Sequence, residues 1–422
     1  MRKTLLLLLL SQVAFGQAPT RYIIRAGKLF DSENKRFKTN QEILVEGDRI
    51  KKVGKLTAKD RANAEVVDLS RSTVIPGLID SHSHLLLSQV SGVPMERDIL
   101  AISEEERIRR AGQYAKEYLD AGITTVKDLG NSGQYLDLIL RKQAESGTTA
   151  SPRIWASGPI LSPPNGQFGK LPEAHKALPE KEYTIVKTPE DAVAAVTEHH
   201  KRGVDVIKVC VTNDNGLILS PEILQAIVKT AHAKGLKVTA HAPFDDVVRD
   251  AIDAGVDGIE HGYGIGDSTL QRMAQKKVYL VPTDGTFEGY KGILSLGEWK
   301  AADSDVNDFV KKAKDRLLRA VKAGVPIVYG SDAYLKSPEH RGAAAKDALI
   351  SYFVAGLAVG DVLQIGTYNG AVAAGKAGEL GVIKPGARAD IVAFEGDLET
   401  NFRPVISRDA SFAMRDGKVF RK

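Results

Sequence analysis

The hydrophobic positions near both ends of the chain recur at every second residue. Short runs of this kind, separated by polar turns, occupy residues 22–31, 41–54, 64–70, 381–397 and 411–422. A period of two is typical of β-strands that bury one face. The pattern therefore predicts a small composite β-sandwich built from both chain ends, residues 19–75 and 385–422.

The middle of the chain alternates short apolar strands with helical stretches. The predicted strands are 73–84, 122–130, 152–158, 204–211, 237–242, 258–262, 278–283 and 326–333. Helical stretches lie between them, for example at 220–235 and 304–324. Eight strands that alternate with helices predict an α/β protein with a (β/α)8 TIM barrel over residues 76–384. A doubly wound open sheet is the alternative, but no glycine-rich dinucleotide loop follows the first strand.

Residues 1–18 have the features of an export signal. A basic start, Arg2 and Lys3, precedes an apolar stretch and small residues that suit cleavage after Gly16 or Ala18. We therefore expect an exported protein, periplasmic or secreted, with no membrane anchor after cleavage.

The charge of the chain bears on its binding partners, and its cysteine content bears on how the fold is stabilised. The formal net charge of +5 is small and is spread along the chain, so no nucleic-acid partner is expected. The single cysteine, Cys210, cannot form an internal disulfide, and packing must stabilise the fold. Assembly into a homo-oligomer stays open.

The first predicted barrel strand ends on His-Ser-His. In an extended strand Asp80, His82 and His84 project to the same side, so two imidazoles could hold one metal ion. Two hydrogen-bonded histidines at a strand end are the alternative. The carboxyl ends of barrel strands meet at one mouth, and later strands place further potential ligands there: Lys208, His241, His261 and Asp332. This convergence favours a metal site, with zinc expected, although manganese, iron or cobalt could occupy the same residues.

These motifs resemble the amidohydrolase superfamily, and within it the prolidase-like and imidazolonepropionase-like metal hydrolases. The resemblance rests on GLIDSHSH, Lys208, TAHA, GIEHG and GSDA in this order, and it extends over nearly the whole mature chain. It implies a site with two divalent metal ions. The implied ligands are His82 and His84 for the first ion, with Asp332 beside it, and His241 and His261 for the second.

The resemblance also implies that Lys208 bridges both ions as a carbamate formed with carbon dioxide. An ammonium group cannot ligate a metal and would be repelled by two dications, whereas a carbamate supplies two oxygens and a negative charge. A neutral or salt-bridged lysine beside a single ion is the alternative.

Two such ions can hold a shared water, lower its pKa from 15.7 toward about 7 and polarise a substrate carbonyl. Asp332 could take the proton of the bridging hydroxide and deliver it to the leaving nitrogen. The alternative role for Asp332 is that of a metal ligand only.

The implied reaction is hydrolysis of an amide bond in a small carboxylate-bearing molecule, a dipeptide or an N-acyl amino acid. Tyr263, His340 and Arg341 are predicted to meet the substrate carboxylate, because an arginine fork can bind both of its oxygens. A surface contact is the alternative for Arg341. A hydrolase of cyclic amides such as imidazolone or hydantoin-like rings, and a barrel that binds without catalysis, also stay open.

Two long loops are expected at the barrel mouth, 159–186 and 284–305, and both are long enough to act as lids. Gln167 stands at about the place where prolidase-like relatives tend to have a histidine. We therefore expect the metal chemistry of the family with a substrate preference of its own.

Overall fold

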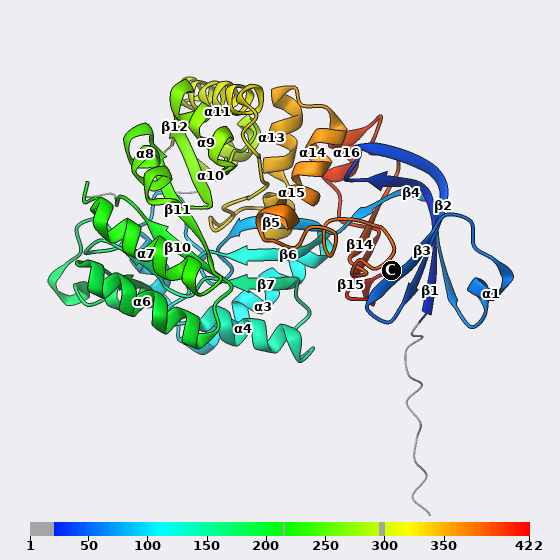
Figure 1. Cartoon of the computed structure of the whole chain (residues 1–422), viewed down its shortest axis with the longest axis horizontal. Helices are drawn as coiled ribbons and strands as arrows, with labels where there is room; N and C mark the ends of the chain where they lie inside the picture. Colours follow the sequence, from blue (N-terminus) through cyan, green and yellow to red (C-terminus); the bar gives the residue numbers. More distant parts are fainter. Residues whose placement is uncertain (1–20, 214–215, 295–299) are drawn as a thin grey trace, which may run out of the picture.

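The computed structural model describes residues 21–213, 216–294 and 300–422. The predicted export signal, residues 1–18, lies outside these ranges. Figure 1 shows two parts, a sheet formed by both chain ends and a larger part in which helices cover parallel strands. Within the described ranges, no helix has the length and apolar character needed to cross a membrane.

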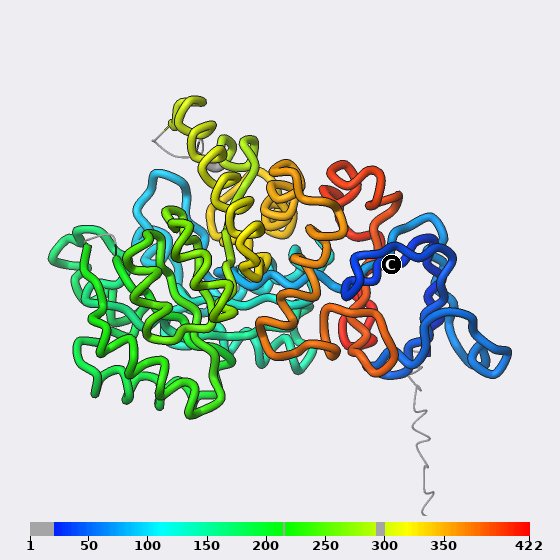
Figure 2. Tube along the Cα trace, turned by 45° about the horizontal axis from the view of Figure 1, so that its top comes forward, coloured from blue at the N-terminus to red at the C-terminus, as the bar shows by residue number. Residues whose placement is uncertain are grey.

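Both chain ends contribute to one seven-stranded sheet with the order β16-β15-β14-β4-β1-β2-β3. Its strands are β1 (Arg21–Asp31), β2 (Arg36–Glu46), β3 (Arg49–Val53), β4 (Glu65–Pro76), β14 (Ile391–Glu395), β15 (Phe412–Arg415) and β16 (Lys418–Arg421). The two ends join where β4 pairs antiparallel with β14, and the blue and red segments lie together in Figure 1 and Figure 2. Side chains from both ends, such as Ile24 and Met414, share one apolar cluster.

The larger part contains two sheets in which every strand pair is parallel, β5-β6-β7 and β13-β12-β11-β10-β8-β9. Their strands are β5 (Leu78–Ser83), β6 (Ile123–Asp128), β7 (Arg153–Ala156), β8 (Ile160–Ser162), β9 (Tyr183–Ile185), β10 (Val206–Cys210), β11 (Lys237–Phe244), β12 (Gly258–Gly264) and β13 (Tyr279–Val281). Strands β5, β6 and β10 are buried at every position, as expected for parallel strands covered on both faces. The predicted α/β class is confirmed.

The third predicted barrel strand, 152–158, is interrupted in the structure. β7 pairs with β6, whereas β8, which follows it in the chain, pairs with β10. Gly158 between them has a φ of 66°, and Pro159 has no N–H for a strand ladder. The predicted loop 159–186 therefore begins with a strand and also contains β9.

The eighth predicted strand, 326–333, is not a regular strand. It forms an isolated bridge at Ile327, because Pro326 has no N–H to donate and Asp332 leaves the extended conformation with a φ of 51°.

The segment 326–333 nevertheless hydrogen-bonds to strands on both of its sides. The N–H of Val328 donates to the carbonyl of Leu280 on β13 (2.9 Å), and the N–H of Asp332 donates to the carbonyl of His82 on β5 (2.8 Å). This second bond brings Asp332 beside the His-Ser-His motif.

Helices surround the parallel strands in Figure 1. They are α1 (Ala58–Arg61), α2 (Met95–Ala101), α3 (Glu104–Asp120), α4 (Leu136–Glu145), α5 (Pro179–Glu182), α6 (Pro189–Arg202), α7 (Pro221–Ala233), α8 (Asp245–Ala254), α9 (Asp267–Lys276), α10 (Phe287–Leu294), α11 (Asp303–Ala323), α12 (Arg341–Ala345), α13 (Asp347–Ala355), α14 (Val359–Ile365), α15 (Tyr368–Ala373) and α16 (Phe402–Ile406), with a 3₁₀ turn at Glu173–His175. Their ends follow local chemistry: Thr188 and Asp191 form a capping box at the start of α6, and Gly203 ends it in the left-handed region.

Gly330 lets the eighth segment approach β5. A Cβ at this position would lie 2.7 Å from the Cβ of His82 and 2.3 Å from the Cγ1 of Val281. We predict that Gly330→Ala lowers the free energy of unfolding by about 1–3 kcal/mol through overpacking, measured by urea denaturation. Gly292→Ala is the control, because a Cβ there meets nothing within 4 Å. Equal stability of the two variants would contradict the close approach.

Candidate active site

A cavity of about 420 Å³ opens at the carboxyl ends of the parallel strands. Its lining includes all of the residues predicted as metal ligands from the sequence: His82, His84, Lys208, His241, His261 and Asp332. The strands therefore bring these side chains to one opening, although they are spread over some 250 positions of the chain.

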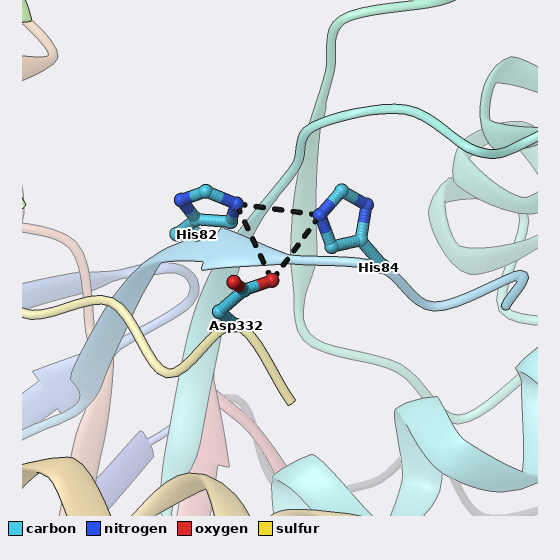
Figure 3. A group of neighbouring side chains, drawn as sticks. All are labelled: His82, His84 and Asp332. Atoms are coloured by element: carbon cyan, nitrogen blue, oxygen red, sulfur yellow. Dashed lines mark hydrogen bonds and ion pairs between the residues drawn. The ribbon is translucent and has the colours of Figure 1, made fainter. Parts of the chain in front are cut away.

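His82, His84 and Asp332 form the tightest group in this cavity (Figure 3). The Nε2 atoms of the two imidazoles are 3.3 Å apart. The Oδ1 of Asp332 lies 3.5 Å from the Nε2 of His82 and 3.4 Å from the Nε2 of His84. One nitrogen or oxygen from each residue lies within 4.8 Å of the others, a spacing that suits a shared metal ion.

The hydrogen bonds on the far side of each ring fix its protonation. The Nδ1 of His82 lies 2.7 Å from the Oε2 of Glu260, and the Nδ1 of His84 lies 2.8 Å from the carbonyl oxygen of Gly130. A carboxylate and a carbonyl only accept, so each Nδ1 carries a proton, and in a neutral ring each Nε2 then keeps its lone pair. Burial lowers the pKa of His82 well below its usual value, which favours this neutral form.

This arrangement fits a divalent cation. Two nitrogen lone pairs that face each other at 3.3 Å repel unless a positive charge lies near both. The Oδ1 of Asp332 is buried and has no hydrogen-bond partner, although an unsatisfied buried carboxylate oxygen is costly. A metal ion bound by all three atoms would remove both penalties.

Lys208, His241 and His261 line the same cavity. The imidazole centroids of His241 and His261 are 4.7 Å apart. The Nδ1 of His261 lies 2.8 Å from the hydroxyl of Thr283, and burial lowers the pKa of His261 well below its usual value, which favours the neutral imidazole. Burial lowers the pKa of His241 to about 3, and this imidazole is therefore neutral as well.

Lys208 is only 2% exposed, on the buried strand β10. Burial lowers its pKa, while the carboxylates of Glu260 and Asp332 act in the opposite direction. Because burial removes the Lys208 side chain from water, it favours the neutral amine over the charged ammonium.

The ends of the last three strand segments adopt an unusual backbone conformation. His261, Thr283 and Asp332 have φ angles of 70°, 54° and 51°, in the left-handed region that side chains other than glycine rarely adopt. Such strain is concentrated at functional sites.

The buried Arg316 of α11 contacts the strained His261 and both chain neighbours of Thr283, and sequence reasoning missed it. Its guanidinium donates to the carbonyls of His261 and Pro282 and pairs with Asp284. The sequence held a weak signal for it, because Arg316 lies on the apolar stripe of its helix, three residues after Ala313.

Sequence reasoning also gave no role to two buried carboxylates, Asp80 and Glu260. Asp80 accepts hydrogen bonds from the N–H and hydroxyl of Ser331 and from the N–H of His82, and burial raises its pKa to about 7. Glu260 accepts from His82, as described above. For Glu260 the signal was a charged residue inside the apolar strand that carries His261.

The cavity lining does not include His340 and Arg341, the two other residues predicted to meet a substrate carboxylate. Arg341 is 5% exposed, and its guanidinium donates to backbone carbonyls, among them those of His84 (3.2 Å) and Ala333 (2.8 Å). The ring of His340 caps α12 and hydrogen-bonds to Asp409. Arg341 is thus hydrogen-bonded to the loops that follow the strands, and His340 to α12 and Asp409.

Tyr263 does line the cavity, with its hydroxyl 3.3 Å from the Nδ1 of His261. Gln167 and Glu96 are also lining residues. Glu96 is half-buried, and within the described ranges its carboxylate has no hydrogen bond or ion pair.

Comparison with known proteins decides the family. The model of the amidohydrolase family matches residues 73–419. The chain belongs to the amidohydrolase family. The resemblance inferred from the sequence is thus confirmed, and the protein is an amidohydrolase-type hydrolase of a family that generally uses divalent metals.

Solved and curated relatives agree with this assignment. A crystal structure of a Xaa-Pro dipeptidase with methionine in its active site is 25% identical, with a TM-score of 0.79 over 95% of this chain and 100% of that one. An uncharacterized protein of Mycobacterium tuberculosis is 28% identical over 290 residues, 66% of this chain and 69% of the relative. Imidazolonepropionase of Streptomyces griseus is 23% identical over 391 residues, 86% of this chain and 88% of the enzyme.

Because Arg341 is buried, we predict that its substitution lowers protein stability, and not that it weakens substrate binding. Arg341→Met leaves several carbonyls without a donor, so the free energy of unfolding should fall by about 2–5 kcal/mol, measured by chemical denaturation. The exposed Arg109→Met is the control, and no measurable loss is expected for it. An Arg341→Met protein of unchanged stability with a raised KM for carboxylate-bearing substrates would instead restore the role inferred from the sequence.

Proposed function

We propose that this amidohydrolase cleaves an amide bond in a small carboxylate-bearing molecule, a dipeptide or an N-acyl amino acid. The proposal rests on one observation. The Nε2 atoms of His82 and His84 face each other beside an Asp332 oxygen that has no hydrogen-bond partner, in a cavity that Lys208 also lines. Likeness to a Xaa-Pro dipeptidase supports the substrate class.

The proposed site holds two divalent ions, with zinc as the expected metal. The proposed ligands are His82, His84 and Asp332 for the first ion, His241 and His261 for the second, and Lys208 for both. When bound, the ions would supply Lewis-acid polarisation of the amide carbonyl and a water that loses a proton near neutral pH.

We further propose that Lys208 carries a carbamate. Its pKa is lowered by burial, and the neutral amine is the form that attacks carbon dioxide. The amine nitrogen forms a bond to the carbon and releases a proton, which leaves an anion with two oxygen ligands. A charged ammonium in this place would oppose two dications.

Asp332 is the proposed proton carrier. Its Oδ1 is turned toward the two imidazoles of the first ligand pair, and its Oδ2 lies 3.9 Å from the Nδ1 of His261. Asp332 would take the remaining proton of the attacking hydroxide and then donate it to the leaving nitrogen, so that one carboxylate serves both steps.

Charge in the cavity favours a dipeptide over an N-acyl amino acid. Among the described lining residues, Glu96 is the carboxylate outside the proposed metal site, and it has no partner there. A dipeptide has a free ammonium group that could meet Glu96, whereas an N-acyl group is neutral. Tyr263 remains the proposed contact for the substrate carboxylate, without His340 and Arg341.

The second candidate is a cyclic-amide hydrolase. Its support is the relationship to imidazolonepropionase, which spans 86% of this chain. Ring opening without release of a free amino acid separates this activity from that of a dipeptidase. A binding protein without catalysis is the third reading, and full metal content with no turnover of any amide would favour it.

Several features beyond catalysis belong to the same proposal. The parallel sheets would close into a (β/α)8 barrel through segment 326–333, with domain limits at 76 and 384. The chain-end sheet, residues 19–75 and 385–422, would form the composite sandwich.

Residues 1–18 would direct export of the protein to the periplasm or the medium. Assembly into a homo-oligomer stays open.

We predict that Asp332→Asn lowers kcat by roughly 10²–10⁴, because the amide keeps an oxygen ligand but cannot accept the proton. Steady-state kinetics together with elemental analysis test this prediction. Metal content should stay near that of the wild-type protein. Unchanged kcat would leave Asp332 a ligand only.

The substrate class is tested by a panel of dipeptides, matched N-acetyl dipeptides, N-acyl amino acids and hydantoins, with zinc-loaded protein. We expect release of free amino acids from dipeptides, and weaker turnover when the ammonium group is acetylated. Glu96→Gln should raise KM for free dipeptides and leave KM for the N-acetyl forms unchanged. Turnover of uncharged cyclic amides alone would refute the proposed class.

A further inference from the structure

The carboxylate of Glu260 lies at the centre of the strand ends, fully buried on β12 beside His261. Its Oε2 is 2.7 Å from the Nδ1 of His82, and its Oε1 accepts a hydrogen bond from the hydroxyl of Thr239 on β11. Glu260 thus connects β12 and β11 with the His-Ser-His motif on β5, and its side chain has no access to solvent or substrate.

The two histidines of this motif are oriented by different means. The Nδ1 of His84 donates to a backbone carbonyl, that of Gly130, which side-chain substitution cannot remove. The Nδ1 of His82 depends on one side chain, that of Glu260. A neutral imidazole has two tautomers of similar energy, and only the Nδ1–H form turns the Nε2 lone pair toward His84 and Asp332.

The negative charge of Glu260 strengthens the hydrogen bond that orients the imidazole of His82. A charge-assisted hydrogen bond to Nδ1–H is stronger than a bond to a neutral amide, and it makes the opposite nitrogen a more basic ligand. Thr239 donates to the other carboxylate oxygen and holds the group in place from a neighbouring strand.

We propose that Glu260 is a positioning residue that fixes the Nδ1–H tautomer of His82 and thereby sets the affinity for the first metal ion. The inference rests on the proposed metal site. It concerns metal affinity and imidazole protonation, and it is independent of which amide the enzyme cleaves.

The test is zinc titration of chelator-stripped, full-length protein against a competing chromophoric chelator, for wild type and Glu260→Gln. We expect one of two zinc affinities to fall by about 10–100-fold in the variant, with the other unchanged. In the zinc-free protein, nitrogen NMR of labelled histidine should show His82 protonated at Nδ1 in wild type and a mixture of tautomers in Glu260→Gln.

Asp390→Asn is the matched control. Asp390 is also a buried carboxylate with an arginine and an N–H as donors, but it lies in the chain-end part of the fold. Its loss should lower stability and leave both zinc affinities unchanged. If Glu260→Gln does not fold, Glu260→Asp, which keeps the charge but shortens the reach, should show the same selective loss.

The outcomes separate the inference from the proposed function. Wild-type protein that binds two zinc ions, with Glu260→Gln binding both as tightly and keeping the His82 tautomer, would overturn the inference alone. Equal affinity losses in the Glu260 and Asp390 variants would overturn it as well. Wild-type protein that binds no zinc would overturn the metal site and the inference together.

Discussion

The site depends on one constraint: two imidazole lone pairs, on His82 and His84, face each other at 3.3 Å. Each ring is held in this state by an acceptor behind it, a carboxylate for His82 and a backbone carbonyl for His84. Without a cation the arrangement is repulsive, and the buried Asp332 oxygen beside it lacks a donor. The fold therefore holds three otherwise unfavourable atoms at a place where a metal ion would satisfy them.

Much of the surrounding structure serves to hold the strand ends in this geometry. Arg341 and Arg316 are buried arginines that donate to backbone carbonyls at the site, including those of His84 and His261. Gly330 allows the segment with Asp332 to lie against β5. Arg341 thus contacts backbone carbonyls and not the cavity, whereas the carboxylate-bearing Glu96 lines the cavity.

The sequence was sufficient to predict the α/β class and to name part of the cavity lining, including all of the proposed metal ligands, because parallel strands place their carboxyl ends together. It could not predict that Pro326 and the left-handed Asp332 prevent a regular eighth strand, since sequence periodicity does not report backbone φ. It also could not separate a buried arginine from an exposed one at position 341. Glu260 was missed because its partner, His82, is 178 residues away in the chain.

The most direct measurement is a crystal structure of active protein purified without chelator, with anomalous scattering recorded at the zinc edge. A two-metal site predicts two peaks about 3.5–4 Å apart, one beside His82 and His84 and one beside His241 and His261. It also predicts density for a carbamate on Lys208 between them. A single peak, or an unmodified lysine in a metal-loaded and active enzyme, would contradict the two-metal account.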